Sequence, residues 1–171
     1  MALIEAISTI RYNRNQSGGT TSFEFTSIPA TYNHLQLACN MKGDSTADAL
    51  SVDVQIGNSS VDTGSQSATS ELGGVLVGQT YLRHYDMMYG AGALMYEFFG
   101  YMTILIADYA DTNKNTSMQV IGGGFGRNDS KIQLQGNTWD STAAVTNIKL
   151  MPMSSTGFLS GTEMTLYGIK D

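Results

Sequence analysis

The chain has 171 residues, a length that suits one hydrophobic core, and its fifteen carboxylates against nine Lys and Arg give a formal charge of −6. This negative balance opposes attraction to phosphate backbones and argues against nucleic-acid binding. Only 14% of the residues are charged and 19 are Gly, a composition that disfavours long salt-bridged helices and favours short strands joined by turns.

Alternation of apolar and polar residues predicts strands along the chain. It is clearest in 34–42 and 49–56, where every second residue is apolar and a polar connection between the segments indicates an antiparallel pair. Segment 98–107 is apolar on both faces, which indicates a central strand. The sequence predicts about nine strands in one antiparallel, jelly-roll-like β-sandwich that spans 1–171. These strands are 3–12, 21–26, 34–42, 49–56, 98–107, 118–123, 131–135, 144–151 and 163–169.

Two segments depart from the strand pattern. Residues 57–80 are rich in Ser, Thr and Gly and predict a long surface excursion. Leu82, Tyr85, Met88 and Tyr89 have helical spacing, which predicts one short helix before Gly90. The Tyr and Met residues of this region serve equally well as core packing or as a subunit interface. The candidate interface residues are Tyr81, Tyr85, Met87, Met88, Tyr89, Met95 and Tyr96.

The residue types needed for nucleophilic catalysis are sparse. His34 and His84 are the only histidines, and neither lies near a Gly-x-Ser-x-Gly motif, so both are interpreted as solvated surface side chains. Cys39 is the only cysteine, which excludes an intramolecular disulfide, and its apolar surroundings predict an inert core thiol. We therefore expect a non-enzymatic protein without a cofactor.

Three patterns of acidic or glycine residues have a functional and a structural interpretation. Asp108 and Asp111 are the carboxylate pair to test for glycoside hydrolysis, against turn-forming acids as the alternative. Asp111-x-Asn113-x-Asn115 resembles the start of a calcium loop, but its expected Gly and closing acid are absent, and no zinc motif exists. The glycines of 122–126 lack the Lys-Ser/Thr of a phosphate loop and predict a turn or bulge.

The sequence shows no secretory signal and no run of eighteen apolar residues, so we expect synthesis in a cytoplasm and no membrane partner. Three positions have expected structural roles. Pro29 fixes a corner, Trp139 anchors a loop onto the core, and Gly168 interrupts the last strand where a backbone approaches closely.

Segments near both ends of the chain resemble a known class of proteins. Residues 25–37 read FTSIPATYNHLQL, and residues 139–148 read WDSTAAVTNI and run on to TLYGIK at 165–170. Both resemble small structural proteins of tailed bacteriophages, in which a similar corner opens a sandwich and a similar strand closes it. The resemblance implies a location in the virion as a capsid decoration (cement) or tail-associated protein. It also implies a homotrimer with the major capsid protein or a tail component as partner.

Two other functions remain open. Exposed Tyr side chains or Trp139 beside Asp and Asn would suit a tail-associated adhesin that binds host surface glycan. An enzyme that depends on Asp108 and degrades a host polysaccharide is the third interpretation.

Overall fold

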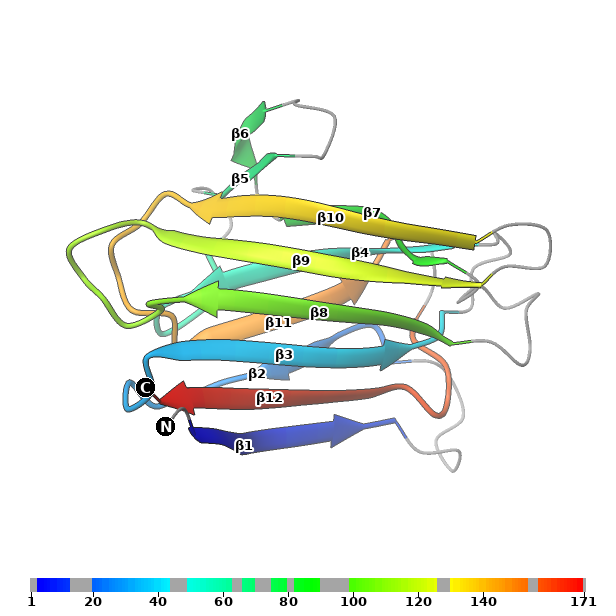
Figure 1. Cartoon of the computed structure of the whole chain (residues 1–171), viewed down its shortest axis with the longest axis horizontal. Helices are drawn as coiled ribbons and strands as arrows, with labels where there is room; N and C mark the ends of the chain where they lie inside the picture. The colour runs from blue at the N-terminus through cyan, green and yellow to red at the C-terminus, as the bar shows by residue number, and fades with distance from the viewer. Residues whose placement is uncertain are drawn as a thin grey trace.

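The structure is a computed structural model that describes residues 3–12, 20–43, 49–62, 66–69, 75–79, 82–89, 99–125, 130–153 and 157–170. The described residues form strands and connections and contain no helix. The described part of the chain therefore has no helix that could span a membrane. Two antiparallel sheets lie one behind the other (Figure 1), which confirms the predicted all-β sandwich.

The larger sheet has eight strands in the order β1-β12-β3-β8-β9-β10-β5-β6. It contains both the first and the last strand of the chain, and the two termini lie close together at one end of the molecule (Figure 1). The strands are β1 (Leu3–Arg11), β12 (Glu163–Lys170), β3 (His34–Met41), β8 (Gly100–Ala107), β9 (Thr116–Phe125), β10 (Ser130–Trp139), β5 (Gln66–Thr69) and β6 (Val75–Gln79).

The smaller sheet has four strands in the order β2-β11-β4-β7. Its strands are β2 (Phe23–Phe25), β11 (Asn147–Pro152), β4 (Ala49–Gly57) and β7 (Leu82–Tyr89). This sheet lies behind the larger one in Figure 1.

The order of the strands is that of a jelly roll. The first four strands pair in reverse order with later ones, namely β1 with β12, β2 with β11, β3 with β8 and β4 with β7. These pairs alternate between the two sheets, as when a long hairpin is rolled into a sandwich. The β5–β6 and β9–β10 hairpins are additions that extend the larger sheet beyond β8.

The core lies between the sheets and follows from the alternation in the sequence. Every second residue of β3 is buried, and so are Leu50, Val52, Val54 and Ile56 of β4. Burial of these side chains removes apolar surface from water, which stabilises the fold by about 25 cal/mol for each Å². Cys39 is fully buried here, as its apolar surroundings predicted.

The nine predicted strands are all present, and three further strands lie in the two segments predicted to depart from the strand pattern. The predicted helix is wrong, because 82–89 forms β7 and pairs with β4 from Val54↔Leu82 to Ala49↔Tyr89. Backbone pairing with a neighbouring strand here overrides the local spacing of the side chains. The predicted excursion at 57–80 contains β5 and β6, which pair with each other, and β5 also pairs with β10.

Pro29 lies at a corner that Tyr109 ties to the core. The hydroxyl of fully buried Tyr109 donates a hydrogen bond to the Pro29 carbonyl oxygen and accepts one from the Tyr32 amide at 3.4 Å. Burial raises the pKa of the Tyr109 hydroxyl. The side chain therefore holds the entry to β3 against the end of β8.

Gly168 has a different role from the one predicted. It lies within continuous β12, between Leu35 of β3 and Glu5 of β1, so the strand is not interrupted. The close approach is made by a ring instead of a backbone, because a Cβ at Gly168 would lie 2.3 Å from Tyr32. Glycine leaves the space that this ring fills.

Trp139 is 2% exposed, at the end of β10. Its indole N–H donates a 2.9 Å hydrogen bond to the carboxylate of Asp62, in the connection that follows β4. A bond from an N–H group to a carboxylate is stronger than one between neutral groups. The contact attaches this connection to the larger sheet.

Candidate functional site

The outer face of the larger sheet carries large hydrophobic side chains on three adjacent strands. Tyr101 is 53% exposed, Ile121 50%, Ile132 80% and Leu134 57%, and Leu105 is also exposed. We call these five residues the apolar face. Contiguous exposed apolar surface of this kind on a folded domain commonly marks a site of interaction.

The register of the strands brings these side chains together. Gly123 of β9 pairs with Tyr101 of β8 on one side and with Ile132 of β10 on the other. In the same way, Ile121 pairs with Leu134 of β10. Since neighbouring strands lie about 4.8 Å apart, these residues form one surface across the sheet.

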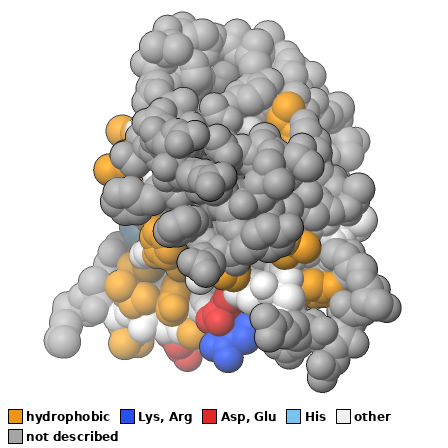
Figure 2. Space-filling view, turned by 90° about the vertical axis from the view of Figure 1, so that its right-hand side faces the viewer, with side chains coloured by type: hydrophobic (Ala, Val, Ile, Leu, Met, Phe, Trp, Pro, Cys, Tyr) orange, Lys and Arg blue, Asp and Glu red, His pale blue; other side chains and the backbone are white. Residues whose placement is uncertain are grey.

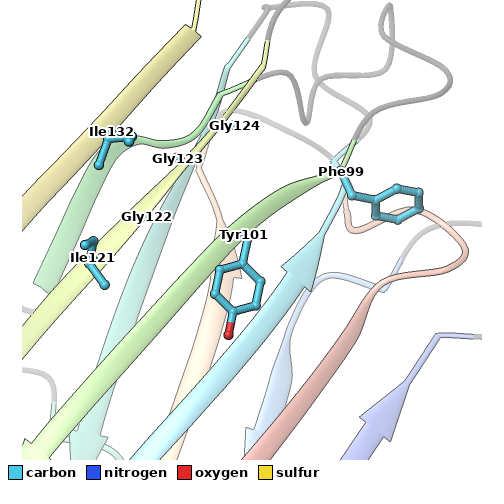
Figure 3. Close-up of a pocket in the computed structure, with 7 residues that line it drawn as sticks. All are labelled: Phe99, Tyr101, Ile121, Gly122, Gly123, Gly124 and Ile132. Carbon is cyan, nitrogen blue, oxygen red and sulfur yellow. The ribbon is translucent and has the colours of Figure 1, made fainter.

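Glycine residues hollow this surface. A depression of about 460 Å³ lies over Gly122, Gly123 and Gly124 and is bordered by Tyr101, Ile121 and Ile132 (Figure 3). A second depression, of about 340 Å³, lies beside it over Thr103 and Gln119 and shares Ile121 as a border. The apolar face therefore combines projecting side chains with adjoining hollows.

The glycine-rich segment was predicted to be a turn or bulge, and this prediction is wrong for its described part. Gly122 to Gly124 continue the regular pairing of β9 with β10. Their missing side chains create the larger hollow instead of a change in chain direction.

Between residues 132 and 137, strand β10 has its hydrophobic side chains outside and its polar side chains inside. Ile132 and Leu134 face solvent, whereas Gln133, Gln135 and Asn137 are buried. An ordinary half-buried strand has the opposite pattern, because burial favours apolar groups. Ile132 and Leu134, which favour burial, are thus left on the surface of the isolated chain, whereas Trp139 at the end of the strand is buried.

Asp108 and Asp111 lie in the turn between β8 and β9, where both contact Lys114. The Lys114 ammonium forms an ion pair with Asp108 and lies 3.8 Å from an Asp111 oxygen. The hydrogen bond to Asp108 raises the pKa of Lys114. The backbone N–H of Asn113 donates to Asp111 at 2.9 Å and lowers the pKa of that carboxyl. These are the contacts of turn-forming acids.

The resemblance of this turn to a calcium loop does not extend to its geometry. The Oδ1 atom of Asp111 accepts hydrogen bonds from Asn113, and the Asn115 amide donates one to Asp140 at 2.9 Å. Among the residues that the structure describes, no three His, Cys, Asp or Glu side chains are grouped to hold a metal ion.

His34 lies at the start of β3 beside this turn. Its Nδ1 atom accepts a 3.0 Å hydrogen bond from the backbone N–H of Asp108. Asp108 has a φ of 49°, a left-handed backbone conformation that the hydrogen bond to His34 supports. The imidazole thus fixes the turn, a more specific role than the solvated side chain that was predicted.

The predicted interface residues fall on the least described part of the chain. The backbones of Tyr85, Met87, Met88 and Tyr89 lie in β7. Their side chains, and all of Tyr81, Met95 and Tyr96, lie outside the described residues, as does the side chain of His84. The interface prediction at these positions stays a prediction.

Sequence reasoning missed the apolar face, although one signal for it was present. Segment 98–107 is apolar on both faces, and β8 lies inside the sheet between β3 and β9, as predicted. Its Met102, Ile104 and Ile106 are buried, whereas Tyr101 and Leu105 face outward. Apolar residues on the outward side of a central strand indicate that something covers that side.

Comparison with known proteins adds no relative. No protein-family model matches the chain, and no curated protein matches it.

Proposed function

We propose that the protein is a non-enzymatic structural protein of a tailed-phage virion, most simply a capsid decoration protein that stabilises the head by subunit contacts. The observation that supports this most is the apolar face, because a sheet surface with Tyr101, Ile121 and Ile132 exposed suits a protein that works by contact. The resemblance of residues 25–37, 139–148 and 165–170 to small virion proteins supports a location in a phage particle.

The mechanism is surface complementarity. A stable protein interface buries about 800 Å² on each partner. A decoration subunit that covers the junction between neighbouring capsomers adds such area many times over a symmetric shell, so weak individual contacts add up to a large total effect. A rigid jelly roll, with its core between two sheets, holds the contacting side chains in fixed positions. The expected partners are other copies of the chain and the major capsid protein or a tail component.

The proposal is tested by adding the purified chain to phage heads that lack it. We expect the wild-type chain to bind at saturating, symmetry-determined stoichiometry and to raise the temperature at which the heads release DNA. Heads that neither bind the chain nor gain stability would contradict the decoration function. Binding at the tail alone would move the protein to the tail-associated group.

Carbohydrate binding by a tail-associated adhesin is the second candidate, and the structure changes which residue could serve it. Trp139 is buried and bonded to Asp62, so it cannot stack on a sugar. Tyr101 is exposed, pairs with exposed Asn40 and borders the larger hollow, which favours it as the aromatic platform. Glycan-array binding that Tyr101→Ala abolishes would support this function.

A further inference from the structure

We propose that the apolar face is covered by a second copy of this chain, so that the outer surface formed by β3, β8, β9 and β10 of the larger sheet is the contact between subunits. The inference rests on the proposed function, since it names the partner of the same surface. It is argued from the charge, the shape and the extent of that surface.

The outward-facing positions of β3, β8, β9 and β10 carry no acidic or basic side chain after His34, among those that the structure describes. They are Gln36, Ala38, Asn40, Tyr101, Thr103, Leu105, Ala107, Ser117, Gln119, Ile121, Gly123, Ile132, Leu134, Gly136 and Thr138. Two copies that each carry a charge of −6 repel one another over most of their surfaces. At this face they can meet without burying a charge.

The charged side chains visible in Figure 2 lie apart from this face on the molecule. Figure 2 looks along the strands, with the outer face of the larger sheet on the left, and hydrophobic side chains stand out on that side. The charged side chains visible in this view gather near the bottom instead. A foreign partner with a basic surface would be attracted to the acidic groups elsewhere, whereas an identical uncharged face needs only a fit in shape.

The shape of the surface suits contact with a copy of itself. Homomeric contacts require that each projecting group find a matching hollow on the same kind of molecule. Here Ile132 and Tyr101 project on either side of Gly123, and the hollows of about 460 and 340 Å³ adjoin them. A second copy can place its projecting side chains in these hollows, where the glycine backbone of β9 allows close approach.

The extent of the surface is that of a subunit interface. Strands β3 and β8 have 8 residues each, and β9 and β10 have 10. Four strands at about 4.8 Å spacing and roughly 26 Å long cover about 500 Å² in projection, before the relief of the side chains is added. This approaches the area of about 800 Å² on each partner that stable interfaces bury.

The burial pattern of β10 gives an independent reason to expect a cover. Its Ile132 and Leu134 are exposed while Gln133 and Gln135 are buried beneath them. Once a second copy packs on the sheet, the hydrophobic side chains of this strand are buried as well. The strand then has both faces covered, and so does β8, whose Tyr101 and Leu105 face the same side.

The test is the mass of the full chain in solution, measured by sedimentation equilibrium over a range of concentrations. We expect an oligomer for the wild type and a monomer for Ile132→Asp/Leu134→Asp. The matched control is Leu3→Asp/Ile4→Asp, which adds the same charge at positions of β1 that are 56% and 58% exposed. The control should remain an oligomer, since these positions lie outside the apolar face.

A variant without added charge keeps the test valid if the double Asp variant fails to fold. Ile132→Ser removes a projecting side chain from a position that is 80% exposed, and we expect it to raise the dissociation constant about tenfold or more. A wild-type chain that is monomeric at all concentrations, or an oligomer that both face variants leave intact, would overturn the inference. Equal dissociation by the control would do so too.

The inference and the proposed function fail in different ways. A monomeric chain that still binds phage heads overturns the inference and leaves the proposed function standing. An oligomer that forms through the apolar face but never binds heads or tails overturns the proposed function alone.

Discussion

Gly168 shows how one missing side chain positions a neighbouring ring. Its hydrogen atom faces the ring of Tyr32, whose hydroxyl donates to Glu5 at 3.2 Å and whose face lies 4.9 Å from the Lys170 ammonium. The ring thus connects the start of β3 to both β1 and β12. A terminal strand pair is held to the sheet by this contact as well as by its backbone bonds.

We expect Gly168→Ala to lower the free energy of unfolding by about 1–3 kcal/mol, the usual cost of forcing an extra group into a packed site. The added Cβ would overlap the Tyr32 ring at 2.3 Å. The measurement is urea denaturation of the wild type, of Gly168→Ala, of Tyr32→Ala and of the variant that combines the two substitutions. In a Tyr32→Ala background the same glycine substitution should cost much less, and equal costs in the two backgrounds would show that the ring is not the cause.

Cys39 makes the free energy of unfolding depend on pH in the alkaline range. Burial raises the pKa of its thiol from the usual value of 9.0, so the unfolded state loses the proton first as the pH rises. The protonated thiol makes its full contribution to the free energy of unfolding below pH 9, and this contribution declines as the pH rises above that value. Cys39→Ala should make the decline above this pH shallower by about 1.4 kcal/mol per pH unit.

The Cys39 prediction is checked by denaturant titrations between neutral and alkaline pH. The small cavity left by alanine lowers stability at every pH, so only the slopes are compared. Tyr32 and Tyr109 also have raised pKa values because of burial, and their part of the decline should remain. Parallel curves for the two proteins would contradict the role of the thiol.

At the scale of elements, alternation in the sequence was sufficient for the strands that bury one face. The segments 34–42 and 49–56 contain uninterrupted alternation, and both form strands with the expected residues in the core. Their pairing was predicted wrongly, because β3 and β4 lie in different sheets. A jelly roll separates consecutive strands, and no local feature of the connection reports this.

The strands missed by sequence reasoning depend on partners distant in the chain. Strand β5 is short and contains a single apolar residue, and it adds to the edge of β10, a strand that lies much later in the sequence, while β6 pairs with β5. Strand β7 has helical spacing but pairs with β4 through a register shift between Leu50 and Val52. The apolar face was missed for a related reason, since it exists only once β8, β9 and β10 are placed side by side.

The inverted burial of β10 gives a prediction with an internal comparison between two isoleucines. Ile104 of β8 is fully buried, and Ile104→Ala should cost about 2–5 kcal/mol of unfolding free energy. Ile132→Ala should cost less than about 0.5 kcal/mol when measured at a concentration where the chain is monomeric. A similar loss for both would mean that Ile132 lies in the core and that β10 is shifted by one residue.

At the scale of the whole molecule, the two sheets form one sandwich, and among the described residues the outer surface of β8, β9 and β10 is hydrophobic and carries no acidic or basic side chain. The first and last described strands are neighbours in the larger sheet, where Leu3 of β1 pairs with Lys170 of β12. The acids of the turn after β8 and the histidine beside them are engaged in fixing that turn. Within the described part of the chain, the surface that we propose for contact with other molecules is the outer face of β8, β9 and β10.

The proposed structural role in a virion is tested most directly by high-resolution imaging of the phage particles to which the proposal assigns this chain. We predict copies of the jelly roll at symmetry-related positions on the particle, with Tyr101, Ile121 and Ile132 buried against a neighbouring protein subunit. Particles that contain no copy of the chain, or copies whose apolar face is exposed to solvent at every position, would contradict the account.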